Sequence, residues 1–361
     1  MFTGNEFRQR REWLVSSLPK HELDAILITN LPNIRYLTGF TGSNGFLLLS
    51  ARHEILFTDP RYTIQAAQET ECRVTTVTGS TLPGVAKAIP KLKVRRLGFE
   101  RNHVSFHVYD YLRGELPLGT ELKPVVDAVE SRRMVKSETE IAVIRRAVET
   151  NSAAFQRALG KARVNMRESD LAGEIEYQMR KLGAEGPSFE TIVAAGPRAA
   201  LPHARPTRNP ISGDQLLLID MGSTQDGYTS DMTRTVFVGS ASPKWKKRYG
   251  AVLEAQLASI AAMRAGVTAA KVDQAGRNIL KSYGLDRAFT HSTGHGLGLE
   301  IHEAPRLGKK EKTVLEAGMV VTVEPGIYLE GEGGIRIEDT VLVTAAGCEV
   351  LTPTSKELTV I

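Results

Sequence analysis

Acidic residues interrupt strongly apolar stretches at several places in the C-terminal half of the sequence. Two of these acids directly follow the runs Leu216–Ile219 and Val320–Val323, and two lie in segments that alternate like β-strands. Burying one unpaired carboxylate costs several kcal/mol, so several of them in one sheet indicate a shared cation. The four acids are Asp220, Asp231, Glu324 and Glu338.

The segment between the first two acids predicts a β-hairpin. Gly222–Gly227 supplies turn residues, and a turn centred on Gln225 and Asp226 places Asp220 directly opposite Asp231. Opposite residues have Cβ atoms about 4.5–5.5 Å apart, and two carboxylates at that distance repel unless a proton or a cation lies between them. This pairing favours a metal ligand over the alternative for Asp220, a turn former at a strand end.

His295 stands between Gly294 and Gly296 and supplies a nitrogen ligand. Glycines let the backbone approach a ligand closely, which fits a metal-binding imidazole better than a core histidine. Arg336 lies two residues before Glu338, and the period of a strand sets both on one face. We expect this guanidinium to pair with a ligand carboxylate, and an ordinary cross-strand ion pair is the alternative.

Four carboxylates and one imidazole form an oxygen-rich donor set that suits Mn²⁺, Co²⁺, Fe²⁺ or Zn²⁺ rather than a thiolate-bound structural zinc. The two cysteines, Cys72 and Cys348, lack metal-ligand spacing and indicate a reducing compartment, so we expect a cytoplasmic protein. The sequence contains neither the G-x-S-x-G motif of serine hydrolases nor a phosphate-binding loop.

The composition is that of a folded globular protein. With 361 residues, 42% hydrophobic and 24% charged, the chain exceeds what one core usually serves. No apolar run reaches membrane-spanning length, and the first twenty residues lack the apolar region of a secretory signal. The net charge of +5 is spread in scattered pairs, which favours a solvated surface over nucleic-acid binding.

The pattern of elements changes along the chain. Short β-rich runs alternate with helix-like stretches from Asp24 to Glu100, which predicts an α/β domain. Beyond a Pro/Gly-bearing stretch at Gly114–Pro124 come long helices and strands, so we expect a smaller N-terminal domain over residues 1–125 and an α+β domain over 126–361, with helices on a mostly antiparallel sheet. The helices expected there span 137–159, 169–182, 242–266 and 272–283; the strands span 191–195, 215–222, 228–238, 319–324 and 334–344.

Five local strings carry a resemblance to a known family. They are Ile-Asp-Met-Gly, Ser-Asp-Met-Thr-Arg, Gly-His-Gly-Leu-Gly-Leu-Glu-Ile-His-Glu, Val-Glu-Pro-Gly and Ile-Arg-Ile-Glu-Asp. In this order they resemble the pita-bread metallopeptidases aminopeptidase P and prolidase. Asn33–Phe40 and Thr58–Tyr62 resemble the creatinase-type N-terminal domain of the same family, so nearly the whole chain is covered.

The resemblance implies hydrolysis of the Xaa-Pro bond at peptide N-termini by a hydroxide held between two metal ions, Mn²⁺ first and Co²⁺, Zn²⁺ or Fe²⁺ as alternatives. It implies that Asp231 and Glu338 bridge the ions, that Asp220 binds one ion, and that His295 and Glu324 bind the other. It gives catalytic roles to Glu324, His302 and His203, and substrate contacts to His203, His291, His302 and Arg336. It also implies a peptide substrate with proline at the second position and a homodimer.

Several alternatives stay open within this resemblance. The run Gly39–Ser43 favours aminopeptidase P, and prolidase, which cleaves Xaa-Pro dipeptides, is the alternative because both use the same ligands. Creatinase-like hydrolases without metal and inactive binding proteins share the fold, but the complete ligand set argues against both. Methionine aminopeptidases usually lack the N-terminal domain.

Overall fold

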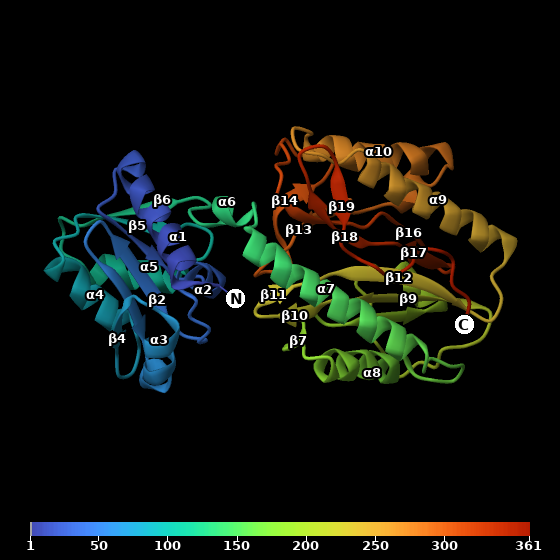
Figure 1. Cartoon of the computed structure of the whole chain (residues 1–361), viewed down its shortest axis with the longest axis horizontal. Helices are drawn as coiled ribbons and strands as arrows, with labels where there is room; N and C mark the ends of the chain where they lie inside the picture. Colours follow the sequence, from blue (N-terminus) through green and yellow to red (C-terminus); the bar gives the residue numbers. More distant parts are fainter. Residues whose placement is uncertain (1) are drawn as a thin grey trace. The chain divides into compact units, whose positions relative to one another are not determined.

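The computed structural model describes residues 2–361 and divides into two compact units, Met1–Arg133 and Met134–Ile361, here called the N-terminal and C-terminal units (Figure 1). The division predicted between residues 125 and 126 falls at the end of strand β6 (Glu121–Val125), which pairs along its whole length with another strand of the N-terminal unit. None of the helices in the described part of the chain is both long and apolar enough to cross a membrane.

The N-terminal unit is built on one six-stranded mixed sheet with the strand order β4-β3-β2-β1-β5-β6. Its central strand consists of four buried apolar residues, as expected for a strand covered on both faces. The other strands are β2 (Phe46–Ser50), β3 (Glu54–Thr58), β4 (Arg73–Thr76) and β5 (Arg96–Glu100), and the central one is β1 (Ala25–Ile28). The alternation of strands and helices predicted for this half is confirmed.

Helices α4 (Leu82–Lys91) and α5 (Phe106–Glu115) supply side chains to the apolar core on one face of this sheet. The remaining helices of the unit are α1 (Gly4–Ser17), α2 (Leu31–Thr38), α3 (Thr63–Glu69) and α6 (Glu130–Arg133). None of residues 2–133 lines the cavity in the other unit that is discussed below.

The C-terminal unit begins with the long helix α7 (Glu138–Leu159), and the predicted capping box is present at its start. The Ser137 hydroxyl accepts from the Glu140 N–H, and the Glu140 carboxylate accepts from the Ser137 N–H. The other helices are α8 (Glu168–Lys181), α9 (Pro243–Ala261) and α10 (Ala269–Ser282). The predicted end of α9 at Gly266 is wrong, because the Gly266 N–H bonds to Leu315 instead of to the helix.

All strand pairs of the C-terminal unit are antiparallel, which confirms the α+β prediction. Three sheets contribute residues to the site, with the orders β12-β9-β8, β14-β13-β15-β18-β19 and β16-β17. Figure 1 shows the strands between the helix pair α7 and α8 and the helix pair α9 and α10. The strands are β7 (Gly186–Pro187), β8 (Ile192–Ala195), β9 (Gln215–Met221), β10 (Ser223–Gln225), β11 (Tyr228–Thr229), β12 (Met232–Val238), β13 (Gly294–Gly296), β14 (Glu303–Leu307), β15 (Val320–Val323), β16 (Gly326–Leu329), β17 (Gly333–Arg336), β18 (Asp339–Val343) and β19 (Cys348–Val350).

Two strands that the sequence predicts as continuous are each interrupted at a predicted metal ligand. Asp231 lies between β11 and β12, and Glu338 lies between β17 and β18. At each break the backbone leaves its regular ladder, and the Glu338 N–H instead donates to Thr233 O at 3.1 Å. The interruptions therefore bring the two carboxylates together from different sheets.

The hairpin that carries the first two acids has a different register from the predicted one. Asp226 and Gly227 both have positive φ and form the two-residue turn, as Asp-Gly pairs often do. This turn sets Asp220 opposite Thr233 rather than opposite Asp231. The predicted direct pairing is therefore wrong, although the alternation of the strand still places Thr233 and Asp231 on one face.

Candidate active site

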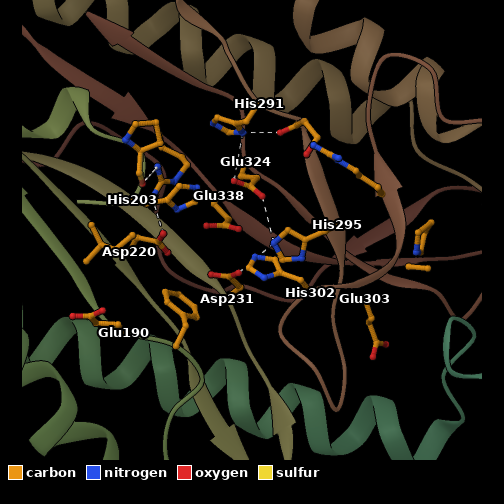
Figure 2. A pocket seen from close by; sticks show the side chains of 18 of the residues that line it. Glu190, His203, Asp220, Asp231, His291, His295, His302, Glu303, Glu324 and Glu338 are labelled. Carbon is orange, nitrogen blue, oxygen red and sulfur yellow. Dashed lines mark hydrogen bonds and ion pairs between the residues drawn. The ribbon is translucent and has the colours of Figure 1, made fainter. Parts of the chain in front are cut away.

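A cavity of about 950 Å³ opens in the C-terminal unit (Figure 2). All nine residues to which the sequence assigns a role line it, and they come from loops and strand ends that are far apart in the chain. They are His203, Asp220, Asp231, His291, His295, His302, Glu324, Arg336 and Glu338.

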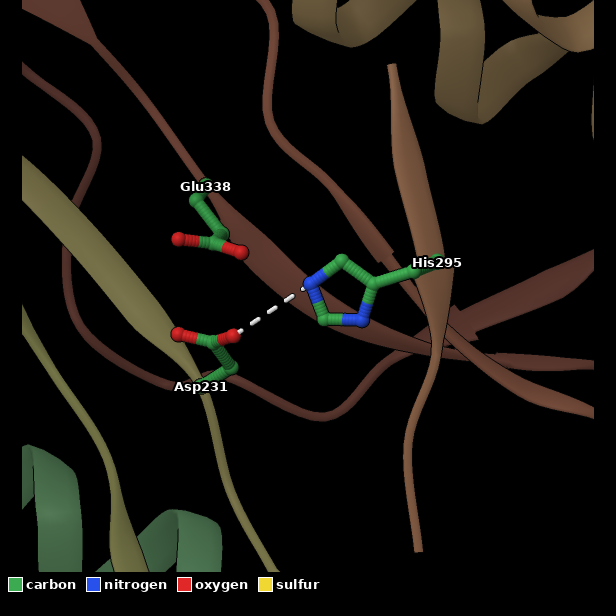
Figure 3. Close-up of side chains that lie close together, drawn as sticks. All are labelled: Asp231, His295 and Glu338. Atoms are coloured by element: carbon green, nitrogen blue, oxygen red, sulfur yellow. Dashed lines mark ion pairs between the residues drawn. The ribbon is translucent and has the colours of Figure 1, made fainter. Parts of the chain in front are cut away.

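Three of these side chains form a tight cluster at the cavity wall. Asp231, His295 and Glu338 each offer one possible ligand atom, and these atoms all lie within 4.8 Å of one another (Figure 3). His295 Nε2 lies 3.6 Å from Asp231 Oδ2 and 3.4 Å from Glu324 Oε1. One nitrogen and several oxygens therefore converge on one small volume.

The hydrogen bonding of the His295 ring leaves its Nε2 atom available as a metal ligand. Its Nδ1 lies 3.0 Å from the Gly296 carbonyl oxygen, which can only accept, so Nδ1 carries the proton and Nε2 the lone pair. Burial lowers the pKa of His295, which also favours the neutral ring. Proteins commonly orient a metal-binding histidine by a hydrogen bond from the ring nitrogen that does not bind the metal.

The glycines beside His295 serve the sheet rather than a ligand. A Cβ on Gly294 would lie 2.0 Å from Thr322 O, and one on Gly296 would lie 2.3 Å from Ala304 O. Both glycines therefore allow β13 to lie closely against its neighbours on either side. The predicted reason for them, close approach of the backbone to a ligand, is wrong, although the position of the imidazole is as expected.

The acids of the cluster carry oxygens that no hydrogen bond among the described residues satisfies. Among the residues that the structure describes, Asp220 Oδ1, Asp231 Oδ1 and Glu338 Oε1 are buried without a hydrogen-bond partner. Burial, and next the nearby Glu338, raises the pKa of Asp231 well above its usual range. Burial likewise raises the pKa of Glu338 and of Glu324. Unpartnered oxygens and mutual repulsion are what a divalent cation relieves, so the donor set fits metal ions.

Arg336 balances part of this negative charge. It is almost completely buried, and its Nη2 donates to Asp220 Oδ2 at 2.6 Å. Its Nε donates at 2.9 Å to the hydroxyl of Thr233, which in turn donates to Glu338 at 2.6 Å. The guanidinium therefore orients two acids of the cluster, one directly and one through Thr233, and leaves their other oxygens facing inward.

His291 has partners for both ring nitrogens within the protein. Nδ1 donates to Ser292 O at 2.7 Å, and Nε2 accepts from the Tyr328 hydroxyl at 2.8 Å. The same hydroxyl accepts from Arg336 Nη1, and burial raises the pKa of Tyr328 to about 12. His291 is therefore held as a neutral ring in a fixed orientation, and its contact with substrate stays a prediction.

His302 and His203 are both exposed to the cavity. The ring of His302 packs edge-on against His295 with 4.4 Å between centroids. Burial, followed by the nearby His295 and His203, lowers the pKa of His302. His203 lies in the loop that follows a short 3₁₀ helix (Gly196–Ala200), and Figure 2 shows it near Asp220. Both rings can reach a molecule in the cavity.

Two residues that organise the site escape sequence reasoning. Thr233 connects Arg336 to Glu338, and Tyr328 connects Arg336 to His291. Thr233 lies two residues after Asp231, so the alternation of a strand is a signal that places it on the same face. Tyr328 carries no such signal, because one partner, Arg336, reaches it through the pairing of β16 with β17, and the other, His291, lies in a loop far away in the chain.

Two family models match the chain. Metallopeptidase family M24 matches residues 142–345, and the creatinase/prolidase N-terminal domain matches residues 10–135. The chain belongs to metallopeptidase family M24. The members of this M24 metallopeptidase family use divalent metals, in agreement with the donor set.

The similarity to individual proteins extends over nearly the whole of this M24 metallopeptidase. An Xaa-Pro dipeptidase of Pyrococcus horikoshii is 37% identical over 96% of this chain and 97% of its own. The structure of an Xaa-Pro dipeptidase from Bacillus anthracis has a TM-score of 0.95 at 39% identity, covering 98% of this chain and 100% of that one. An X-Pro aminopeptidase from Thermotoga maritima has a TM-score of 0.91 at 38% identity, with coverages of 97% and 99%.

These comparisons confirm the pita-bread fold with a creatinase-like N-terminal domain. They also change the preference between two activities. Curated relatives from Pyrococcus horikoshii, Pyrococcus furiosus and Lactobacillus helveticus, which are 36–39% identical, are named Xaa-Pro dipeptidase. The prolidase alternative is therefore better supported than aminopeptidase P, which the run Gly39–Ser43 had favoured.

Proposed function

We propose that this M24 metallopeptidase is a prolidase, which hydrolyses the bond between the first residue and proline in Xaa-Pro dipeptides with the help of two divalent metal ions. The observation that carries this proposal is the cluster of Asp231, His295 and Glu338, which lines a cavity large enough for a dipeptide and contains two buried carboxylate oxygens without a partner among the described residues. The names of the curated relatives support the dipeptide as substrate.

Five residues hold the ions in this proposal. Asp231 and Glu338, together with Asp220, His295 and Glu324, would hold the two ions. When bound, such ions polarise the scissile carbonyl and make water nucleophilic at neutral pH. Oxygen-rich donors favour Mn²⁺, with Co²⁺, Zn²⁺ or Fe²⁺ as alternatives.

Glu324 moves the proton in the proposed reaction. Its Oε1 faces His295 at 3.4 Å, its side chain is largely buried, and burial raises its pKa above the usual value of a carboxyl group. Glu324 takes the proton from the attacking water and gives it to the proline nitrogen as the C–N bond breaks. The products are a free amino acid and proline.

The histidines and Arg336 orient the substrate and the acids. His203 and His302 face the cavity with exposed rings, so they hydrogen-bond the substrate and steady the tetrahedral intermediate. His291 and Arg336, which are fixed by Tyr328, form the wall against which the substrate lies.

A comparison of three peptides tests the proposal. Chelator-treated protein is reconstituted with Mn²⁺ and given an Xaa-Pro dipeptide, an Xaa-Pro-Yaa tripeptide and an Xaa-Ala dipeptide. The prolidase proposal predicts that the Xaa-Pro dipeptide is cleaved fastest and that Asp231→Asn abolishes this turnover. Faster cleavage of the tripeptide contradicts it and supports the aminopeptidase alternative, which the Thermotoga maritima structure favours at 38% identity.

We also propose a cytoplasmic homodimer. Cys72 and Cys348 are both free thiols, as expected in a reducing compartment. Light scattering of the purified protein tests the dimer: a mass near twice the 39.5 kDa of the chain is expected, and a monomer contradicts it.

A further inference from the structure

A buried ion pair lies just outside the nine site residues. The Lys136 ammonium donates to Glu303 Oε1 at 2.7 Å, and the two side chains are only 1% and 7% exposed. A buried pair of this kind is often no more stabilising than an apolar pair of the same size, whereas removing one partner leaves an uncompensated charge. Stability alone therefore explains this pair poorly.

Glu303 occupies a special place beside the cavity. It is the first residue of β14 and directly follows His302, whose ring is exposed to the cavity. In Figure 2 the Glu303 side chain points away from Asp231 and His295. The His302 ring projects from the neighbouring residue toward His295. The orientation of Glu303 therefore fixes the backbone that carries the His302 ring.

The carboxylate of Glu303 also lies against the turn that follows His295. A Cβ on Gly298 would lie 2.6 Å from Glu303 Oε1, so the carboxylate packs directly on the backbone of that turn. The Gly298 carbonyl accepts from both the N–H and the hydroxyl of Thr229, at 2.8 and 3.0 Å. Thr229 lies two residues before Asp231, so the contact continues to the segment between β11 and β12 that holds this acid.

Lys136 connects the pair to a third part of the site. Its N–H donates to Gly318 O at 2.9 Å, and its neighbour Val135 forms a β-bridge with Met319. Met319 directly precedes β15, which ends at Val323, and Glu324 is the next residue. The backbone of Lys136 therefore joins the strand that leads to Glu324, while its ammonium holds the residue next to His302.

We propose that Lys136 and Glu303 are positioning residues for the reaction. Through Glu303, the Lys136 ammonium fixes where β14 begins and holds the His302 ring at its place beside His295. Lys136 lies outside the cavity, whereas Glu303 is part of its wall and binds the Lys136 ammonium with its carboxylate. The proposal rests on the proposed function in one respect, because it takes His302 to act on the bound peptide.

Two single substitutions and their combination test this role. Lys136→Met removes the ammonium and keeps an apolar stem, and Glu303→Gln keeps the size of the side chain without its charge. Each is expected to lower kcat for an Xaa-Pro dipeptide roughly 10–100-fold, as the loss of orienting partners does, with KM and bound metal changed less than about twofold. The double variant is expected to lose no more than the worse single one, because both act through one contact.

Lys161→Met is the matched control, since Lys161 pairs with Glu174 on the surface of the same unit. It is expected to leave kcat and KM unchanged. All assays are made at a temperature where circular dichroism shows each variant to be fully folded. If Lys136→Met and Glu303→Gln lower only the melting temperature and keep kcat within about twofold of the wild type, the positioning role is wrong.

A second measurement does not depend on turnover. The chain has eight histidines, and the ring signals of His302 in an NMR spectrum of the full protein are expected to shift in Glu303→Gln, while those of His21 and His53 stay in place. Unchanged His302 signals overturn the proposal even if the wild type cleaves no Xaa-Pro peptide. Absence of cleavage by the wild type overturns the proposed function instead. If Lys136→Met does not fold, Glu303→Gln alone decides.

Discussion

The Arg336 guanidinium donates to Asp220 at 2.6 Å and reaches Glu338 through the hydroxyl of Thr233. One buried cation therefore sets the orientation of two acids whose remaining oxygens have no partner in the described part of the chain. Because a guanidinium presents several donors in one plane, it can make these contacts at the same time. A lysine ammonium keeps the charge without this geometry.

Arg336→Lys is therefore expected to weaken Mn²⁺ binding and the hydrolysis of an Xaa-Pro dipeptide by roughly 10–100-fold, although the charge is unchanged. Isothermal titration of chelator-treated protein measures the first effect and steady-state kinetics the second. Arg248→Lys, at a partly buried ion pair with Glu332 outside the cavity, is the control and should alter neither. Wild-type affinity in Arg336→Lys would mean that only the charge of this residue matters.

Asp231→Asn is expected to have opposite effects on stability with and without metal. In the metal-free protein it removes one of several buried like charges, and a gain of about 1–2 kcal/mol raises Tm by roughly 2–8 °C for a unit of this size. In excess Mn²⁺ the wild type is expected to be more stable than the variant, because it gains binding free energy that the variant lacks. Calorimetry with and without chelator checks both. If the variant were the more stable protein both with and without Mn²⁺, a shared cation would be contradicted.

Metal removal itself is expected to lower the stability of the wild type. Mn²⁺ at one hundred times its dissociation constant stabilises the folded state by about 2.7 kcal/mol for each site, provided that the unfolded chain does not bind it. Titration of Mn²⁺ during thermal unfolding therefore gives a Tm that keeps rising with concentration. The rise of Tm with Mn²⁺ concentration should be much smaller in Asp231→Asn. A Tm independent of Mn²⁺ in the wild type argues against a metal site.

Glu324→Gln tests the proton transfer separately from metal binding. The amide keeps an oxygen for the ion but cannot carry the proton from water to the proline nitrogen, so kcat is expected to fall roughly 10²–10⁴-fold. Metal content, measured by atomic emission, should stay above half of that of the wild type. Loss of both together would indicate that Glu324 is a ligand alone.

Alkaline pH is expected to destabilise the C-terminal unit through Tyr249. Burial raises the pKa of this phenol from 10 to about 12, and its hydroxyl donates to Lys356 O. The folded state therefore favours the neutral form, so the contribution of Tyr249 is complete below pH 10 and is lost as the pH rises toward 12. Urea unfolding between pH 9 and pH 11 should show a steeper loss in the wild type than in Tyr249→Phe. If the free energy of unfolding fell equally with pH in both proteins, this assignment would be contradicted.

Local signals in the sequence were sufficient for much of the fold. The capping box at Ser137 and Glu140 depends on residues three apart, and it correctly starts α7. Acids that follow apolar runs, such as Asp220 and Glu324, both line the cavity, because a carboxylate beside a buried apolar run must find a partner.

Contacts between distant segments were beyond such signals. The role of Tyr328 depends on the pairing of β16 with β17 and on two partners at opposite sides of it in the chain, His291 and Arg336. The breaks of the strands at Asp231 and Glu338 likewise depend on two sheets meeting, which no single stretch of residues records. Lys136 and Glu303, which are 167 positions apart, form their ion pair for the same reason.

The two-residue turn at Asp226 and Gly227 has a consequence for what the chain tolerates. Surface turns usually accept insertions, because few contacts depend on their length. Here one added residue shifts the strand pairing by one position, and a shift by one turns every side chain of a strand to the opposite face. Asp231 would then face away from His295, although no residue of the cavity had been altered. The length of this exposed turn is therefore as constrained as the identity of the acids themselves.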